Sequence, residues 1–153
     1  MNSPRNLLKA EDQRHRTVFL FPDEVSLSLD DLLSNREFQQ ILKNRRLARL
    51  GDAYVNFLFS LALTKASGIP VGVKVSDRIL FEAAKNSGIR PLLPRRIKRG
   101  EVANVIEALV VDSWMRKSLE LDEMVDIISK NSDDLTEAAT QLVKSILERM
   151  RNH

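Results

Sequence analysis

The chain has 153 residues, 43% of them apolar and 29% charged, which is typical of a globular domain with its own core. It contains no cysteine, which excludes disulfides and thiolate metal sites. No apolar run is long enough to span a membrane and the N-terminus lacks a signal-peptide pattern, so we expect a cytosolic protein with no membrane partner. The formal net charge is only +3, so the distribution of charge is more informative than its sum.

The N-terminal segment differs in composition from the rest of the chain. We expect residues 1–27 to form a basic tail and a short extended segment, and residues 28–153 to form a helical domain. Residues 1–16 are polar and basic with little to bury, which predicts a tail that orders only against a partner. Residues 17–21, TVFLF, are β-prone and stop at Pro22, which predicts an extended piece outside any large sheet.

From Leu29 onward the apolar residues follow a helical spacing, which predicts an all-α domain of six or seven helices. The expected elements are a short helical pattern at 29–34 and helices at 36–44 (able to continue into the next), 45–66, 77–87, 101–118, 121–130 and 134–150. The helix at 45–66 is apolar on more than one face, so we expect it to be central. Gly68 ends it, Ser76 caps the next helix and Gly88 closes that one.

Basic residues gather in two stretches that contain no acid, 43–49 and 90–99. Such clusters indicate an anionic partner, nucleic acid first. A solvated basic loop beside a structural helix is the alternative. The second stretch precedes the helix expected at 101–118, whose N-terminal N–H groups favour phosphate. The expected RNA-binding residues are Arg45, Arg46, Arg95, Arg96, Lys98 and Arg99.

One polar stripe follows the expected central helix, where Arg49, Asp52 and Asn56 share a face. In one interpretation Arg49 and Asp52 form a surface ion pair, which contributes only about 0.3–0.5 kcal/mol. In the other, Asp52 meets a second acid from a neighbouring helix. Glu107 is the candidate, because it lies in an apolar helix with Asn104 one turn before it. Two such carboxylates could bind a hard cation such as Mg²⁺ through oxygen.

Two stretches resemble the signature motifs of the ribonuclease III family. RLARLGDAYVNF, at 46–57, resembles the family's N-E-R-L-E-F-L-G-D-[AS], and NVIEALVVDSW, at 104–114, resembles D-x-x-E-A-L-[IV]-G-A. Their order and separation agree with the family, and the resemblance covers about residues 44–116. It points to the short archaeal-type branch, which lacks a separate double-stranded-RNA-binding domain. The resemblance implies a helical endonuclease domain that binds structured or double-stranded RNA and uses Mg²⁺.

The family's metal site takes two carboxylates from each motif. The resemblance implies that Asp52 and Glu107 are the catalytic and metal-binding residues. The other two ligand positions hold Ala48 and Asn104, so two of the four expected carboxylates are replaced. A single-metal site with help from Glu101, one turn before Asn104, is one way in which cleavage could persist.

Two arginines also depart from the family pattern. Arg45 stands at the first Glu of the signature, and Arg49 stands at the Phe that helps to join the dimer in bacterial relatives. An arginine in that apolar socket would bury an unpaired positive charge, which is energetically costly. We therefore expect a monomer or a rearranged pair in place of the bacterial dimer, so a homodimer and a ribonucleoprotein subunit both stay open.

Three functions are compatible with these observations. The first is a ribonuclease III-type endoribonuclease that processes RNA with a reduced Mg²⁺ site, which the surviving Asp52–Glu107 pair favours. The second is an inactive relative that binds ribosomal RNA as a large-subunit or ribosome-associated protein, which the replaced ligands favour. The third is a helical protein–protein module that uses the acidic stretch 120–137, but this leaves the two motifs unexplained.

Overall fold

The computed structural model describes residues 36–152. The tail expected at 1–16, the extended segment at 17–21, the helical pattern at 29–34 and the boundary after residue 27 all lie outside the described residues. Within residues 36–152 the domain is all-α, as predicted, and contains no strand. Its elements are α3 (Arg36–Lys43), α4 (Arg45–Ser67), α5 (Asp77–Ser87), the 3-10 turn η1 (Arg90–Leu92), α6 (Arg99–Met115), α7 (Leu121–Ser129) and α8 (Leu135–Arg151).

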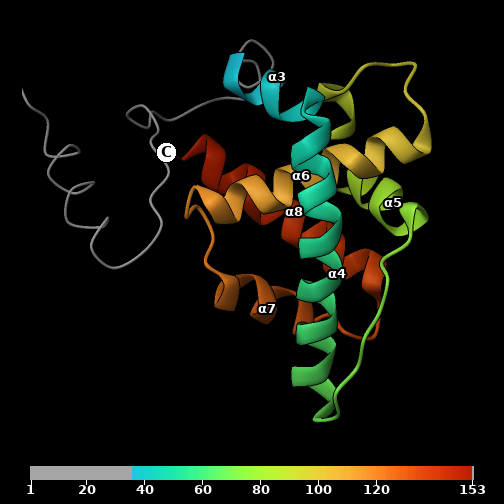
Figure 1. The fold of residues 1–153 in the computed structure, drawn as a ribbon, viewed down its shortest axis with the longest axis vertical. Coiled ribbons are helices and arrows are strands. Elements are labelled where there is room, and N and C mark those ends of the chain that lie inside the picture. The colour runs from blue at the N-terminus through green and yellow to red at the C-terminus, as the bar shows by residue number, and fades with distance from the viewer. Residues whose placement is uncertain (1–35, 153) are drawn as a thin grey trace, which may run out of the picture.

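Figure 1 shows how these helices are arranged. Helix α4 runs along the long axis of the molecule, and α6 crosses behind its upper half. Helix α7 packs against α4 lower down, and α8 packs mainly against α5. The connection from α4 to α5, residues 69–76, returns alongside α4 and is called the strap below. This arrangement places the N-terminal half of α4 and the first half of α6 side by side.

Helix α6 is the most buried helix of the described residues, and the expectation that the 45–66 helix is central was wrong. Every residue of α6 from Val102 to Ser113 is buried except Asn104. Helices α3, α4, α5 and α8 all pack against it. Helix α4 buries only part of its surface, through Ala48, Gly51, Val55, Leu58, Phe59 and Ala62. Periodicity alone could not distinguish these two helices, because both are apolar on several faces.

Local capping signals set most helix ends. Asn44 separates α3 from α4, because its Oδ1 accepts a hydrogen bond from the backbone N–H of Leu47 at 3.0 Å. Ser76 caps α5 as predicted, and Gly68 ends α4 with the left-handed backbone that glycine favours (φ 76°). Helix α6 starts at Arg99, two residues earlier than expected, so the basic cluster includes the first residue of the helix.

At Gly51 the backbones of α4 and α6 lie very close together. A Cβ added at Gly51 would lie 2.1 Å from the backbone oxygen of Glu107 and 2.4 Å from its carbonyl carbon. Real Cβ atoms do not approach other atoms this closely, so only glycine allows the two backbones to meet here. The contact therefore brings Asp52, the next residue of α4, toward Glu107 of α6.

Helices α7 and α8 close the far side of the core. Arg149 of α8 donates a hydrogen bond to Glu123 of α7 at 2.6 Å and another to the backbone oxygen of Ser118. The acidic stretch 120–137 covers α7, the connection that follows it and the first turn of α8. Glu123 also takes part in the capping box at the start of α7. Within residues 36–152, no helix combines the length and apolar character that crossing a membrane requires.

Candidate functional site

The two acids singled out in the sequence lie together at the crossing of α4 and α6. Both Asp52 and Glu107 line one cavity of about 850 Å³. The carboxyl group of Asp52 lies close enough to Glu107 to raise the pKa of the Glu107 carboxyl group. Their exposure differs, since Glu107 is only 5% exposed whereas the side chain of Asp52 is about half exposed. The structure therefore brings together two residues that are 55 positions apart in the chain.

The carboxyl group of Glu107 is unusual because it is buried beside other acids. Burial, as the largest cause, and the neighbouring carboxyl group of Asp52 together raise the pKa of Glu107 to about 8. The charge of Asp77 adds to this effect, and the ammonium of Lys74 opposes it. Glu107 therefore binds a proton more readily than an ordinary exposed carboxyl group does.

Lys74, and not Arg49, is the basic partner of Asp52. The Lys74 ammonium lies 3.7 Å from Asp52 Oδ1. The same oxygen accepts a hydrogen bond from the side-chain amide of Asn56 at 3.3 Å. The ion pair between Arg49 and Asp52 that the spacing allowed is not formed. No local pattern pointed to Lys74, because it lies 22 residues after Asp52 in a segment without helical periodicity.

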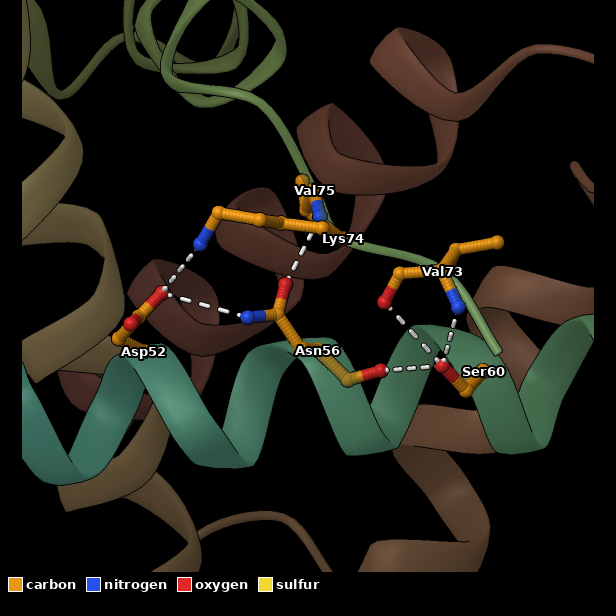
Figure 2. Close-up of polar contacts among 6 residues, drawn as sticks. All are labelled: Asp52, Asn56, Ser60, Val73, Lys74 and Val75. Carbon is orange, nitrogen blue, oxygen red and sulfur yellow. Dashed lines mark hydrogen bonds and ion pairs between the residues drawn. The ribbon is translucent and has the colours of Figure 1, made fainter.

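A row of polar side chains on α4 binds the strap, as Figure 2 shows. Asn56 Oδ1 accepts a hydrogen bond from the backbone N–H of Val75 at 2.8 Å, and Ser60 Oγ accepts one from Val73 at 2.8 Å. Thr64 repeats the arrangement one turn later. Since these residues recur every four positions on α4, they face alternate residues of the extended strap. This row, Asp52, Asn56, Ser60 and Thr64, is called the polar ladder below.

The cavity at the α4–α6 crossing carries more basic than acidic residues. Its lining includes four cations, of which three come from the start of α4 and one from the strap. The remaining lining residues are three acids, one amide and one alanine. The complete lining is Arg45, Arg46, Ala48, Arg49, Asp52, Lys74, Asp77, Asn104 and Glu107. The sequence analysis placed most of these residues at the site but missed Lys74 and Asp77.

A second cavity, of about 370 Å³, adjoins the first. It shares Arg45, Ala48 and Asn104 with it and continues along α3 and the loop before α6, where it meets Pro94 and Ile97. Glu101, considered in the sequence analysis as an extra metal ligand, lines this second cavity and does not line the first. Glu101 therefore does not join Asp52 and Glu107 in one ligand set.

The loop before α6 presents its basic residues to solvent. Arg95, Arg96, Lys98 and Arg99 are all exposed, and neither cavity described above includes them in its lining. Arg90 holds the loop by donating hydrogen bonds to the backbone oxygens of residues 94 and 95, each at 3.0 Å. The loop is thus supported from within, and its other cations are exposed, with the Arg99 guanidinium lying over the ring of Phe81 at 5.4 Å from its centroid.

The residues at the crossing do not fit the family's four-carboxylate metal site. Ala48 is buried and offers no ligand, and Asn104 offers only a neutral oxygen. The Lys74 ammonium lies against Asp52, which is one of the two remaining acids. Within residues 36–152, no group of three or more His, Asp or Glu side chains is arranged to hold a metal ion. This donor set is poor for Mg²⁺, which is bound in proteins mainly through carboxylate oxygens and water.

An exposed apolar face on α4 was also missed by the sequence analysis. Leu50 and Phe57, two large apolar residues of α4, are 49% and 55% exposed. Trp114 of α6 is 41% exposed, and its ring stacks on Tyr54 with centroids 5.3 Å apart. Leu50, Tyr54 and Phe57 recur at three- and four-residue spacing, so they lie along one side of α4.

Comparison with known proteins assigns a family to most of the chain. The sequence model of one family, described as Ribonuclease III, matches residues 45–150. The matched region begins at the first residue of α4 and ends near the end of α8, so it includes both helices that carry the site. A search of curated proteins found no match.

Proposed function

Because the chain belongs to the ribonuclease III family, we propose that it is a cytosolic protein that binds structured or double-stranded RNA. The contact surface is the face where α4 begins and where the loop leads into α6. The observation that carries this proposal is the concentration of cations there, at the cavity and on the adjoining loop. The proposed RNA contacts are Arg45, Arg46, Arg95, Arg96, Lys98 and Arg99.

Helix energetics support a role for these cations outside folding. Arg45 and Arg46 are the first residues of α4, and its first turn contains no acid. Lys98 is the N-cap residue of α6, and Arg99 is the first residue of that helix. A positive side chain at a helix N-terminus opposes the helix dipole, which favours negative charge there. These cations therefore do not serve helix stability, whereas an RNA phosphate would be bound by both the side chains and the free N–H groups.

A paired substitution tests the RNA-binding proposal. We expect the double variant Arg95→Ala, Arg96→Ala to bind duplex RNA more weakly, with little dependence on its sequence. If both arginines contact phosphate, the slope of log K against log salt should fall by about 1.8. The control is Lys130→Ala, Lys144→Ala, which removes the same charge from exposed positions just after α7 and on α8. Equal affinity of the two double variants would contradict this contact surface.

Cleavage of RNA is a second candidate function, favoured by the contact between Asp52 and Glu107. If the reduced site cleaves, the protein should cut duplex RNA with Mg²⁺, and Asp52→Asn should abolish cutting. If the protein only binds RNA, as a ribosomal or ribosome-associated protein, it should cut nothing. It should then remain with ribosomal subunits in native lysate after a high-salt wash.

The exposed apolar face is proposed to pair two copies of the chain. Leu50 and Phe57 occupy the side of α4 next to Arg49, and Trp114 extends the face onto α6. A pair centred on these residues would be rearranged relative to the bacterial dimer, because Arg49 would stay at its rim. Large exposed apolar side chains that lie together mark interaction sites.

The N-terminal segment is proposed to add to RNA binding. The sequence of residues 1–16 is basic and poor in apolar residues, and its structure lies outside the described residues. Limited proteolysis with and without duplex RNA tests this proposal. RNA should slow cleavage within residues 1–16, and equal cleavage in both states would contradict the idea.

A further inference from the structure

The polar ladder fixes the position of Lys74. The residues on either side of it, Val73 and Val75, donate backbone hydrogen bonds of 2.8 Å to Ser60 and Asn56 of α4. Val75 is also buried in the core. In an extended segment, fixing the two neighbours fixes the direction of the residue between them. Figure 2 shows the resulting side chain of Lys74 reaching back toward Asp52.

The ammonium of Lys74 lies near Asp52, but this contact leaves its hydrogen-bond donors free to bind a ligand. The distance of 3.7 Å to Asp52 Oδ1 is long for a hydrogen bond, and the Lys74 side chain is 77% exposed. The same carboxylate oxygen already accepts a hydrogen bond from Asn56. An ammonium carries three donors, so Lys74 can bind an anion without leaving its place.

Charges around the cavity favour an anion over a cation. Four basic side chains face three acidic ones in the lining. The basic residues that make this excess are Arg45, Arg46, Arg49 and Lys74.

We propose that this cavity binds a phosphate group of RNA directly, with Lys74 as a phosphate ligand, and that this binding needs no divalent cation. The inference deepens the proposed RNA-binding function and rests on it. An ammonium and neighbouring guanidinium groups supply the positive charge that a metal ion would supply in a carboxylate-rich site. Asn56 acts as a positioning residue, because it orders both Asp52 and the strap that carries Lys74.

A binding assay with and without metal tests the inference. Fluorescence anisotropy of labelled duplex RNA should give the parent protein the same affinity in EDTA and in Mg²⁺. We expect Lys74→Ala to weaken binding about tenfold and to lower the salt slope by about 0.9, while Lys74→Arg retains most of the affinity. Lys144→Ala, an exposed lysine on α8, is the matched control. Loss of binding in EDTA, or an unchanged Lys74→Ala variant, would overturn the inference.

Replacing Asp52 separates an anion site from a cation site. If the cavity binds phosphate, Asp52→Asn removes a competing negative charge and should leave RNA affinity equal or higher. If the cavity binds RNA through a metal ion, the same variant loses a ligand and should bind RNA more weakly in Mg²⁺. Weaker binding by Asp52→Asn would therefore refute direct phosphate binding.

Inorganic phosphate distinguishes failure of the inference from failure of the proposed function. Addition of phosphate to the ¹⁵N-labelled protein should shift the amide signals of Asn56 and Lys74, and the Lys74→Ala variant should lose the shift at Asn56. A protein that binds phosphate in this way but no RNA would disprove the proposed function and leave the anion site standing. A protein that binds RNA but shows neither the phosphate shift nor an effect of Lys74→Ala would disprove the anion site and leave the proposed RNA-binding function in place.

Discussion

Replacing Gly51 with alanine should destabilise the domain and separate the two acids of the site. The added Cβ would lie 2.1 Å from the backbone oxygen of Glu107, whereas ordinary van der Waals contact begins at 3.4 Å. The contact must therefore lengthen by about 1.3 Å. Neither side of it is a flexible side-chain end, since both belong to helix backbones, so α4 and α6 would have to move apart.

The cost of this movement can be estimated. Overpacking costs about 1–3 kcal/mol and this contact belongs at the upper end. The higher helix propensity of alanine relative to glycine offsets about 1 kcal/mol of this cost. The net loss in free energy of unfolding is then about 2 kcal/mol, which corresponds to a fall in Tm of about 4–8 °C.

Urea unfolding followed by circular dichroism measures this difference, and Gly100→Ala is the matched control. Gly100 also lies in a helix, but a Cβ there would meet only Asp77 Oδ2 at 3.5 Å. The control should therefore be neutral or gain up to about 1 kcal/mol. If Gly51→Ala is as stable as the parent, the close crossing of α4 and α6 is not what brings Asp52 and Glu107 together.

Three further outcomes follow from the site and its surroundings. The pKa of Glu107 is raised from 4.5 to about 8 in the native protein, so between these pH values the native carboxyl group binds a proton that the unfolded chain has lost. The free energy of unfolding should therefore fall as the pH rises from 4.5 through 8. Thermal melts should show Glu107→Gln gaining stability over the parent across that range, with no gain for Glu101→Gln, an exposed acid on the same helix. Phe57→Glu should lower the apparent mass in light scattering if two copies pair through α4, and an unchanged mass would exclude that face. Ala48→Glu combined with Asn104→Asp should lower Tm in the absence of metal, because the added carboxylates are buried and repel their neighbours. Mg²⁺ should restore part of the lost Tm by binding the folded state. A Tm that does not change with Mg²⁺ would mean that the four carboxylates do not converge at the site.

Local signals in the sequence predicted the elements well. Ser76 and Gly88 bound α5 at the residues expected, and Gly68 ends α4 as expected. These signals act between residues that are a few positions apart, so they can be recognised without the fold. The two motifs likewise identified the family, because they preserve residue types at fixed spacing.

Which faces of the helices become buried could not be predicted in the same way. Leu50 and Phe57 share a helix with Val55 and Phe59, and all four are large apolar residues, yet the first two are exposed and the last two are buried. The difference depends on which side of α4 meets α6 and α7. That choice is made by packing between distant segments, so it has no counterpart in a single periodic pattern.

The sequence by itself determined that Asp52 lies on a helix, after a glycine and one turn before an amide, in a motif shared with the ribonuclease III family. Only the tertiary structure decided what surrounds it. Gly51 lets α4 meet α6 and brings Glu107 to Asp52, while the polar ladder holds the strap and brings Lys74 to the same carboxylate. A helix repeat relates residues three or four positions apart, whereas Asp52, Lys74 and Glu107 come from three separate segments, and only the packing of those segments sets the charge that a ligand meets there.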